Sequence, residues 1–236
     1  MLKKHIFGAA LLGAVAFGPV SATAATASFD FAAMADVYKA ANAGQEGSWD
    51  QVTGGSVTDN GITITDAKGT WAGDPLGDLT HAFFDGTDGS GPAGLGVCHS
   101  GWNGSLSECS SNGGAFPGDD NIGMGEALTL IFDRAVWITD LLLRDAGHQL
   151  LDGTVSINGS VYTVVAGMID SWDLKSIGTV DTFTFAYDDG EIYLSKMGVD
   201  DDPNNNPAPV PLPAGGVLLL GGLAGLAGLK RRRRKA

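Results

Sequence analysis

The sequence predicts an all-β body. The expected architecture is a β-sandwich of the jelly-roll type. Three observations support this prediction. Short segments in which apolar and polar residues alternate dominate the chain. Glycine accounts for 36 of the 236 residues, and stretches with the charge pattern of a surface helix are scarce. At least eight alternating segments separated by tight turns are the pattern of a sandwich, and residues 26–202 are long enough for one core.

The first half of the body contains two alternating segments and one candidate helix. Ala27–Phe31 and Gly61–Thr65 alternate clearly, so we expect each to form a strand. Ala32–Ala41 is a candidate short helix. Residues 86–125 are rich in glycine and polar residues, and we expect a long loop region there.

The second half contains six further segments that we expect to form strands: Glu126–Phe132, Val136–Leu143, Thr154–Ile157, Val161–Val165, Thr182–Tyr187 and Ile192–Val199. Asp133-Arg134-Ala135 is expected to join the first two as separate strands. The strongest hairpin signal is Asn158-Gly159-Ser160, because Asn-Gly readily adopts positive φ. The last two segments are expected to pair with each other through Asp188-Asp189-Gly190-Glu191.

Residues 1–25 have the order of a secretory signal peptide. Lys3 and Lys4 precede an apolar stretch, and the segment Ser21–Ala25 offers an A-x-A cleavage site. We therefore expect the export machinery to carry the body out of the cytoplasm and signal peptidase to remove this segment. In an exported chain the only two cysteines, Cys98 and Cys109, predict one disulfide that closes a surface loop. Zinc binding is the alternative, but the ligand set is incomplete.

The C-terminus combines three features in a fixed order. Residues 203–209 form a polar linker, and the following Pro-bracketed motif must be extended. An apolar run of 18 residues ending at Leu229 is long enough for one transmembrane helix, and the cations after it stay in the cytoplasm. The motif is Val210, Pro211, Leu212, Pro213 and Ala214, and the basic stop is Lys230, Arg231, Arg232, Arg233, Arg234 and Lys235.

This order resembles the PEP-CTERM sorting domain of Gram-negative bacteria, in its Val-Pro-Leu-Pro-Ala (VPLPA-CTERM) variant. The resemblance covers residues 210–236 and implies an exosortase, an integral-membrane enzyme, as partner. The precursor would be held in the inner membrane and then released to the cell surface or the exopolysaccharide matrix. The most common form of the family has Glu where this chain has Leu212, which bears on the exosortase subtype. A permanent membrane anchor without processing is the alternative.

The body also resembles the extracellular jelly-roll domains that often carry this sorting signal. That resemblance implies a fold and a surface location, but it does not imply any particular activity. The matching segments are Gly94–Cys98, Asp119–Asn121, Glu126–Phe132 and Leu143–His148.

The released body is expected to be far more acidic than the whole chain. The chain has 14 Lys and Arg against 27 Asp and Glu, but eight of the cations and none of the acids lie in the two terminal segments. The body therefore carries 6 cations and a net charge of −21. Such a body should repel nucleic acid and anionic lipid, and it suits divalent cations. Acidity that only maintains solubility is the simpler alternative.

The sequence favours a binding or structural protein over an enzyme. H-E-x-x-H, G-x-S-x-G and P-loop signatures are absent. The alternative function is a secreted hydrolase acting on extracellular glycan, because two carboxylates suffice for that reaction and the many acids supply pairs.

Calcium is the candidate cofactor. Asp119, Asp120 and Asn121 lie in a Gly-flanked loop before a predicted strand, and Asp145 lies at the end of the following one. Calcium prefers several oxygen ligands from a loop that can surround it. The same residue types also form turns with their own side chains, and no EF-hand spacing occurs.

Exopolysaccharide is the candidate ligand, and tryptophan side chains are the candidate contacts. Trp49, Trp71, Trp102 and Trp172 lie in or near Gly- and Asp-rich segments where an exposed ring could stack on a sugar. Packing in the core is the alternative for each of them.

Overall fold

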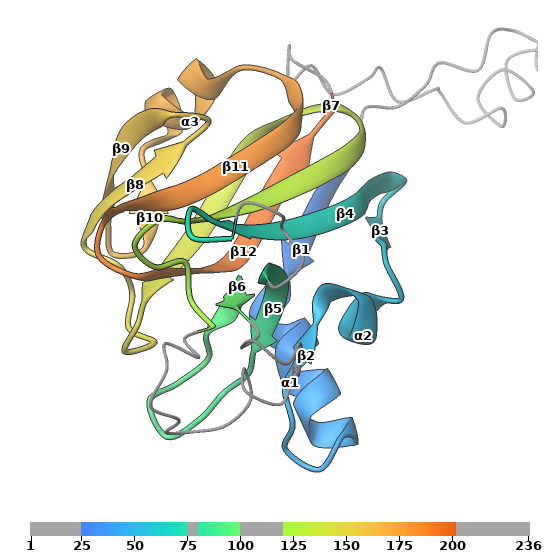
Figure 1. The fold of residues 1–236 in the computed structure, drawn as a ribbon. Helices are drawn as coiled ribbons and strands as arrows, with labels where there is room; N and C mark the ends of the chain where they lie inside the picture. The colour runs from blue at the N-terminus through green and yellow to red at the C-terminus, as the bar shows by residue number, and fades with distance from the viewer. Residues whose placement is uncertain (1–24, 75–79, 100–119, 202–236) are drawn as a thin grey trace, which may run out of the picture. The chain divides into compact units, whose positions relative to one another are not determined.

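The computed structural model describes residues 25–74, 80–99 and 120–201, all within one compact unit. Antiparallel strands predominate in these residues, which confirms the all-β prediction (Figure 1). Residues 1–24, the linker at 203–209 and the sorting segment at 210–236 lie outside the described residues. Within the described ranges, no helix has the length and apolar character needed to cross a membrane.

The elements follow one another in this order: β1 (Thr26–Asp30), α1 (Phe31–Ala41), β2 (Gly47–Ser48), α2 (Trp49–Thr53), β3 (Val57–Asp59), β4 (Ile62–Trp71), β5 (Thr80–Asp85), β6 (Gly94–His99), β7 (Glu126–Asp145), β8 (Gly153–Ile157), β9 (Ser160–Val165), β10 (Met168–Ile169), α3 (Ser171–Ile177), β11 (Val180–Asp189) and β12 (Ile192–Asp200).

Strand β7 connects the two parts of the sheet. Its first part lies between β4 and β11, with Leu130 opposite Ala67 on one side and Phe183 on the other. Its second part pairs with β12, with Leu143 opposite Leu194. The strand order is β10-β9-β8-β11-β7-β12-β6-β5-β2, with β1 beside β12 and the β3–β4 pair beside β7. Figure 1 shows β4, β7 and β11 in front of β12 and β1.

The prediction of two strands at Glu126–Phe132 and Val136–Leu143 is wrong, because β7 is one strand of 20 residues. Asp133-Arg134-Ala135 contains neither Gly nor Pro, so nothing in it forces a turn. Its side chains are exposed, and Arg134 donates to the carbonyl oxygen of Gly61 at 2.8 Å. The charged segment is the exposed middle of a long strand.

The predicted hairpin at Asn158-Gly159 is confirmed. Asn158 and Gly159 have φ of 51° and 80°, and Ile157 pairs with Ser160. Two central residues with positive φ match the right-handed twist of the flanking strands.

The predicted pairing of the last two strands is wrong. β11 pairs with β7 and β8, and β12 pairs with β7, β6 and β1. The connection through Gly190, whose φ is 107°, therefore crosses from one part of the sheet to the other. A short polar connection is compatible with a hairpin and with such a crossing, so its sequence does not distinguish the two.

The prediction of a long loop over residues 86–125 is also wrong in part, because β6 lies within it. Five of the six residues of β6 are buried, and so are five of the six residues of β5. Neither strand therefore alternates between buried and exposed positions. Such strands are covered on both faces and lack the period of two. The candidate helix at Ala32–Ala41 is confirmed as α1, which begins one residue earlier. The short helices α2 and α3 were not predicted.

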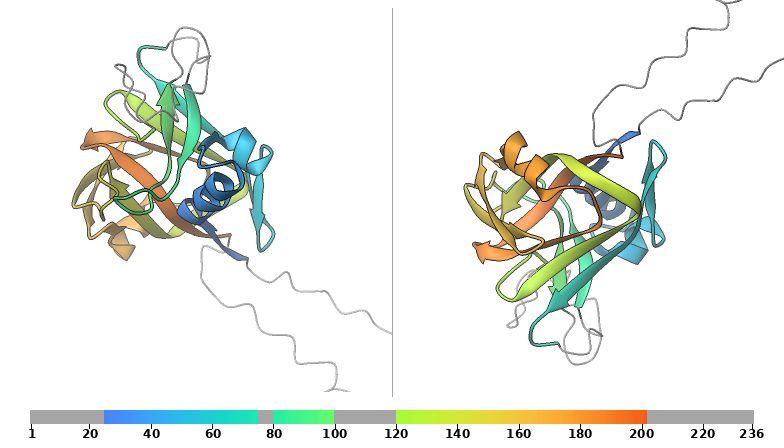
Figure 2. Two further views of the ribbon diagram at one scale, coloured as in Figure 1. Left: turned by 90° about the horizontal axis from the view of Figure 1, so that it is seen from below. Right: turned by 90° about the horizontal axis from the view of Figure 1, so that it is seen from above.

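One apolar core joins the layers and the helices. The ring of Phe132 lies edge-on to Phe29 and to Phe183, at centroid distances of 6.2 and 5.9 Å. The indole of Trp49 stacks on Phe84 at 5.8 Å, which ties α2 to β5. Figure 2 shows α1 and α2 grouped beside β5 and β6. This packing fixes the loops at the end of β5, where the candidate site lies.

Candidate functional site

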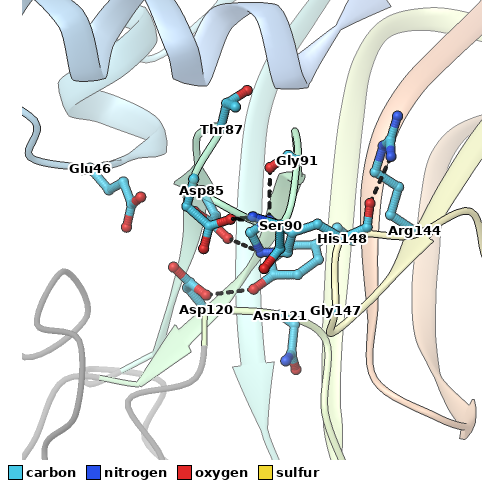
Figure 3. A network of polar contacts seen from close by, with 12 residues as sticks. Glu46, Asp85, Thr87, Ser90, Gly91, Asp120, Asn121, Arg144, Gly147 and His148 are labelled. Carbon is cyan, nitrogen blue, oxygen red and sulfur yellow. Dashed lines mark hydrogen bonds and ion pairs between the residues drawn. The ribbon is translucent and has the colours of Figure 1, made fainter.

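Three carboxylates from distant parts of the sequence meet where β5 ends (Figure 3). Glu46 immediately precedes β2, and Asp85 is the last residue of β5. The pairing of Gly47 with Phe84 brings the two acids together. Asp120 supplies the third carboxylate, and one oxygen of each residue lies within 4.8 Å of the other two.

Asp120 is held by β6 and β12. The amide of Val97 donates to the carbonyl oxygen of Asn121 at 3.2 Å, which fixes the backbone next to Asp120. Gly96 permits this approach, because a Cβ there would lie 1.9 Å from the carbonyl oxygen of Asp120. The buried hydroxyl of Tyr193 donates to Oδ1 of Asp120 at 2.7 Å.

His148 contacts the cluster from the turn after β7. Its Nε2 lies 2.9 Å from Oδ2 of Asp85, and its Nδ1 lies 2.9 Å from the carbonyl oxygen of Gly91. A carbonyl oxygen only accepts, so Nδ1 carries a hydrogen. Nε2 then faces the carboxyl group of Asp85, and it can accept a hydrogen bond from that group when the carboxyl group is protonated.

The turn that carries His148 is closed by its neighbours. Oδ1 of Asp145 accepts from the amides of Gly147 and Gln149, both at 2.9 Å. The guanidinium of Arg144 donates to the carbonyl oxygen of His148 at 2.7 Å, as Figure 3 shows. These bonds hold His148 at a φ of 61°, which a side-chain-bearing residue rarely adopts.

The environment of Asp85 favours its protonated form. Burial, the charge of Asp120, and a hydrogen bond and charge from Glu46 raise the pKa of Asp85 from 3.8 to about 9, against a smaller opposing effect of Lys39. Only 6% of Asp85 is exposed. An ion pair between Lys39 and Glu46 balances part of the negative charge.

This arrangement has the chemistry of a hard-cation site. Calcium takes oxygen ligands at about 2.3–2.6 Å, so two ligands of one ion lie at most roughly 5 Å apart. The three carboxylate oxygens satisfy that limit. A cation that binds here would replace the proton on Asp85.

Of the predicted calcium ligands that the structure describes, only Asp120 joins the cluster. Asn121 points away in Figure 3, and its amide donates to Glu191 at 3.3 Å. Asp145 belongs to the turn described above, and Asp119 lies outside the described residues. Sequence reasoning did not assign Glu46, Asp85 or His148 to a site. Glu46 and Asp85 lie in no motif, and the segment that ends at His148 was matched for its fold alone. The one sequence signal that pointed to this cluster was the position of Asp85 directly after the apolar Phe83-Phe84.

The candidate sugar-binding tryptophans are placed in different environments. Trp49 is 2% exposed, and its indole nitrogen donates to the carbonyl oxygen of Gly55, so it is a core residue here. Trp71 is half-buried with its ring 4.3 Å from that of His99. Trp172 is 80% exposed in the first turn of α3. Trp102 lies outside the described residues.

The predicted disulfide has one described member. Cys98 is buried in β6 and is disulfide-bonded. Cys109 lies outside the described residues, so its pairing with Cys98 stays a prediction. The sorting motif and the basic stop also lie outside them.

No protein-family model, no curated protein and no solved structure matches this chain. The site is therefore interpreted from its own geometry.

Proposed function

We propose that the chain is an exported, non-enzymatic protein of the cell surface or exopolysaccharide matrix, and that its body binds calcium at Glu46, Asp85 and Asp120. One observation carries the cation site: three carboxylates from separate segments converge on one largely buried point. Like charges repel at such distances unless a proton or a cation is shared among them.

Export and exosortase processing are supported by residues 1–25 and 210–236 of the sequence. Calcium is supported by the net charge of −21 on the body, and it agrees with the proposed extracellular location, where weak calcium-binding modules occur. A sheet that folds over a single core supports the proposed β-sandwich in jelly-roll form. The exposed ring of Trp172 supports a contact with polysaccharide.

The processing proposal is tested by the intact mass of the protein released from the cell surface. We expect a mass that lacks both the first 25 residues or so and the Arg-rich tail. A released protein that keeps the basic tail contradicts exosortase processing and favours a permanent anchor.

The cation proposal is tested by thermal unfolding with EDTA and with added calcium. We expect chelation to lower the melting temperature and calcium to restore it. Asp85→Asn should remove the calcium response, whereas Asp140→Asn, an exposed acid in β7, should keep it. Identical melting curves with and without EDTA contradict the proposal.

A glycan hydrolase is the second candidate, and the state of Asp85 favours it. A carboxylic acid that stays protonated at neutral pH beside other carboxyl groups has the state of a general acid. However, Asp85 is nearly inaccessible, and two grooves of about 590 and 360 Å³ are lined by other residues. Release of reducing ends that disappears in Asp85→Asn would establish the hydrolase instead.

A further inference from the structure

A groove of about 590 Å³ lies among β1, α1, α2 and β3. Within the described ranges β1 pairs only with β12 and β3 only with β4, so each of the two strands has an unpaired side. Side-chain bonds link them instead. The amide of Ser28 donates to Oδ2 of Asp59 at 2.8 Å, and the side-chain amide of Asn60 donates to the carbonyl oxygen of Thr26 at 3.0 Å. The groove therefore lies where no backbone ladder closes the sheet, beside the two helices in Figure 1.

Helix α1 has apolar side chains on two sides. Its buried side carries Phe31, Ala32 and Ala35. Its groove side, joined by spacings of three and four residues, carries Ala33, Met34, Val37, Tyr38 and Ala41. Val37 is 72% exposed. The outer side of a surface helix is ordinarily polar, so this second apolar side indicates that α1 contacts an apolar group other than the core.

The walls of the groove are continuous with the core. Phe29 lines the groove and is only 2% exposed, and Met34, Val52 and Val57 line it while also packing against the core. An apolar group that binds here is therefore removed from water. The volume lies within the range of about 300–1,000 Å³ that is typical of small-molecule sites, which are mostly apolar with a few polar groups.

The charged side chains among the described lining residues are both acidic. Oδ1 of Asp30 accepts from the amide of Ala33 at 2.9 Å, and Oδ2 of Asp59 accepts from the amide of Ser28. These bonds orient the two carboxylates and use one oxygen of each, so the second oxygen can accept from a ligand. Within residues 25–74, 80–99 and 120–201, no Lys, Arg or His forms an ion pair with either acid.

We propose that this groove binds a small organic cation with an apolar body, of the alkylammonium or arylammonium class. The apolar body contacts Met34, Val37 and Val57, and the cationic group lies beside Asp30 and Asp59. The charge of the lining determines the sign of the ligand, because an anionic amphiphile would meet two carboxylates and no cation among the described lining residues. No lining residue belongs to the carboxylate cluster, so the proposal is independent of calcium.

The test follows the amide NMR shifts of the full chain, in micelles of a non-ionic detergent, as benzyltrimethylammonium is added. We expect saturable shifts at Ala33, Val37 and Val57. Tetramethylammonium lacks the apolar body, and phenylacetate carries the opposite charge. Each should bind at least about fivefold more weakly than benzyltrimethylammonium.

Two variants separate the charge from the space in the groove. Asp30→Asn combined with Asp59→Asn removes both charges and keeps both acceptors, since Asn caps a helix as well as Asp does. We expect it to weaken binding of benzyltrimethylammonium at least about fivefold. Ala33→Phe should block binding by filling the groove. Asp140→Asn combined with Asp181→Asn, both exposed acids outside the groove, is the matched control and should bind as the unsubstituted chain does.

Three results would overturn the proposal. They are equal affinity for the three small ligands, shifts confined to amides outside the groove, and an equal loss of binding in the two double variants. Shifts in the groove with the peptide Lys-Leu-Lys, but not with benzyltrimethylammonium, would also overturn it in favour of a basic peptide. Circular dichroism checks that each variant has folded, and the comparison of ligands on the unsubstituted chain decides if a variant has not.

Discussion

Nε2 of His148 lies 2.9 Å from Oδ2 of Asp85, and both side chains are less than 10% exposed. The carbonyl oxygen of Gly91 accepts from the other ring nitrogen, so Nε2 can accept a hydrogen bond from a protonated Asp85 carboxyl group. Burial, and then the charges of Asp120 and Glu46, raise the pKa of Asp85 and so disfavour a negative charge on it. Through this proton, pH and cations act on the stability of the protein.

The stability of the cation-depleted protein should fall as pH rises. The folded state keeps the proton on Asp85 up to a pKa of about 9, whereas the unfolded state loses it near 3.8. Between these values the folded state binds more protons, so the free energy of unfolding declines, by at most about 1.4 kcal/mol per pH unit. The contribution is complete below about pH 4 and is lost by about pH 9. Urea unfolding in EDTA across this range measures it.

Asp85→Asn should flatten that dependence, because the amide does not titrate. Asp140→Asn removes one exposed acid and should leave the slope unchanged. Parallel pH profiles for the unsubstituted chain and Asp85→Asn would show that Asp85 is not the titrating group.

Calcium binding should release a proton and should strengthen as pH rises toward about 9. The ion replaces the proton on Asp85, so each bound calcium releases up to one proton at neutral pH. Calorimetry in two buffers of different ionisation enthalpy measures that number. An affinity that does not change with pH would mean that calcium binds elsewhere.

Gly96→Ala should disrupt the carboxylate cluster although Gly96 is not a member of it. A Cβ at Gly96 would lie 1.9 Å from the backbone oxygen of Asp120, so the Asp120 segment must move. We expect a loss of about 1–3 kcal/mol in stability and a weaker calcium response. Gly89→Ala, where a Cβ would meet nothing within 4 Å, is the control and should change stability by less than about 0.5 kcal/mol. Equal behaviour of the two variants would contradict this account of Asp120.

Substitution of Trp172 should affect polysaccharide binding, whereas substitution of Trp49 should affect stability. Trp172→Ala removes an exposed ring and should leave stability within about 0.5 kcal/mol, while weakening the proposed retention on exopolysaccharide. Trp49→Ala removes a core ring and should cost about 3–5 kcal/mol. Unchanged retention of Trp172→Ala would remove this residue from the proposed sugar contact.

The sequence predicted elements whose signal is local. The hairpin at Asn158-Gly159 depends on two residues that adopt positive φ, and α1 on a run of helix-forming residues, so both were found. β5 and β6 were missed because they are buried on both faces and do not alternate. β11 and β12 were expected to pair, but the choice of β7 as their shared partner depends on contacts between distant segments.

The sequence by itself determined the all-β class, the acidic body and the expectation of export, because these follow from periodicity, composition and the order of charged and apolar segments. Only the tertiary structure decided which of 27 acids meet. Glu46, Asp85 and Asp120 have no common spacing. Pairing of β2 with β5, the approach of Asp120 to Gly96, and the turn that presents His148 bring them together, and each depends on contacts between segments far apart in the chain.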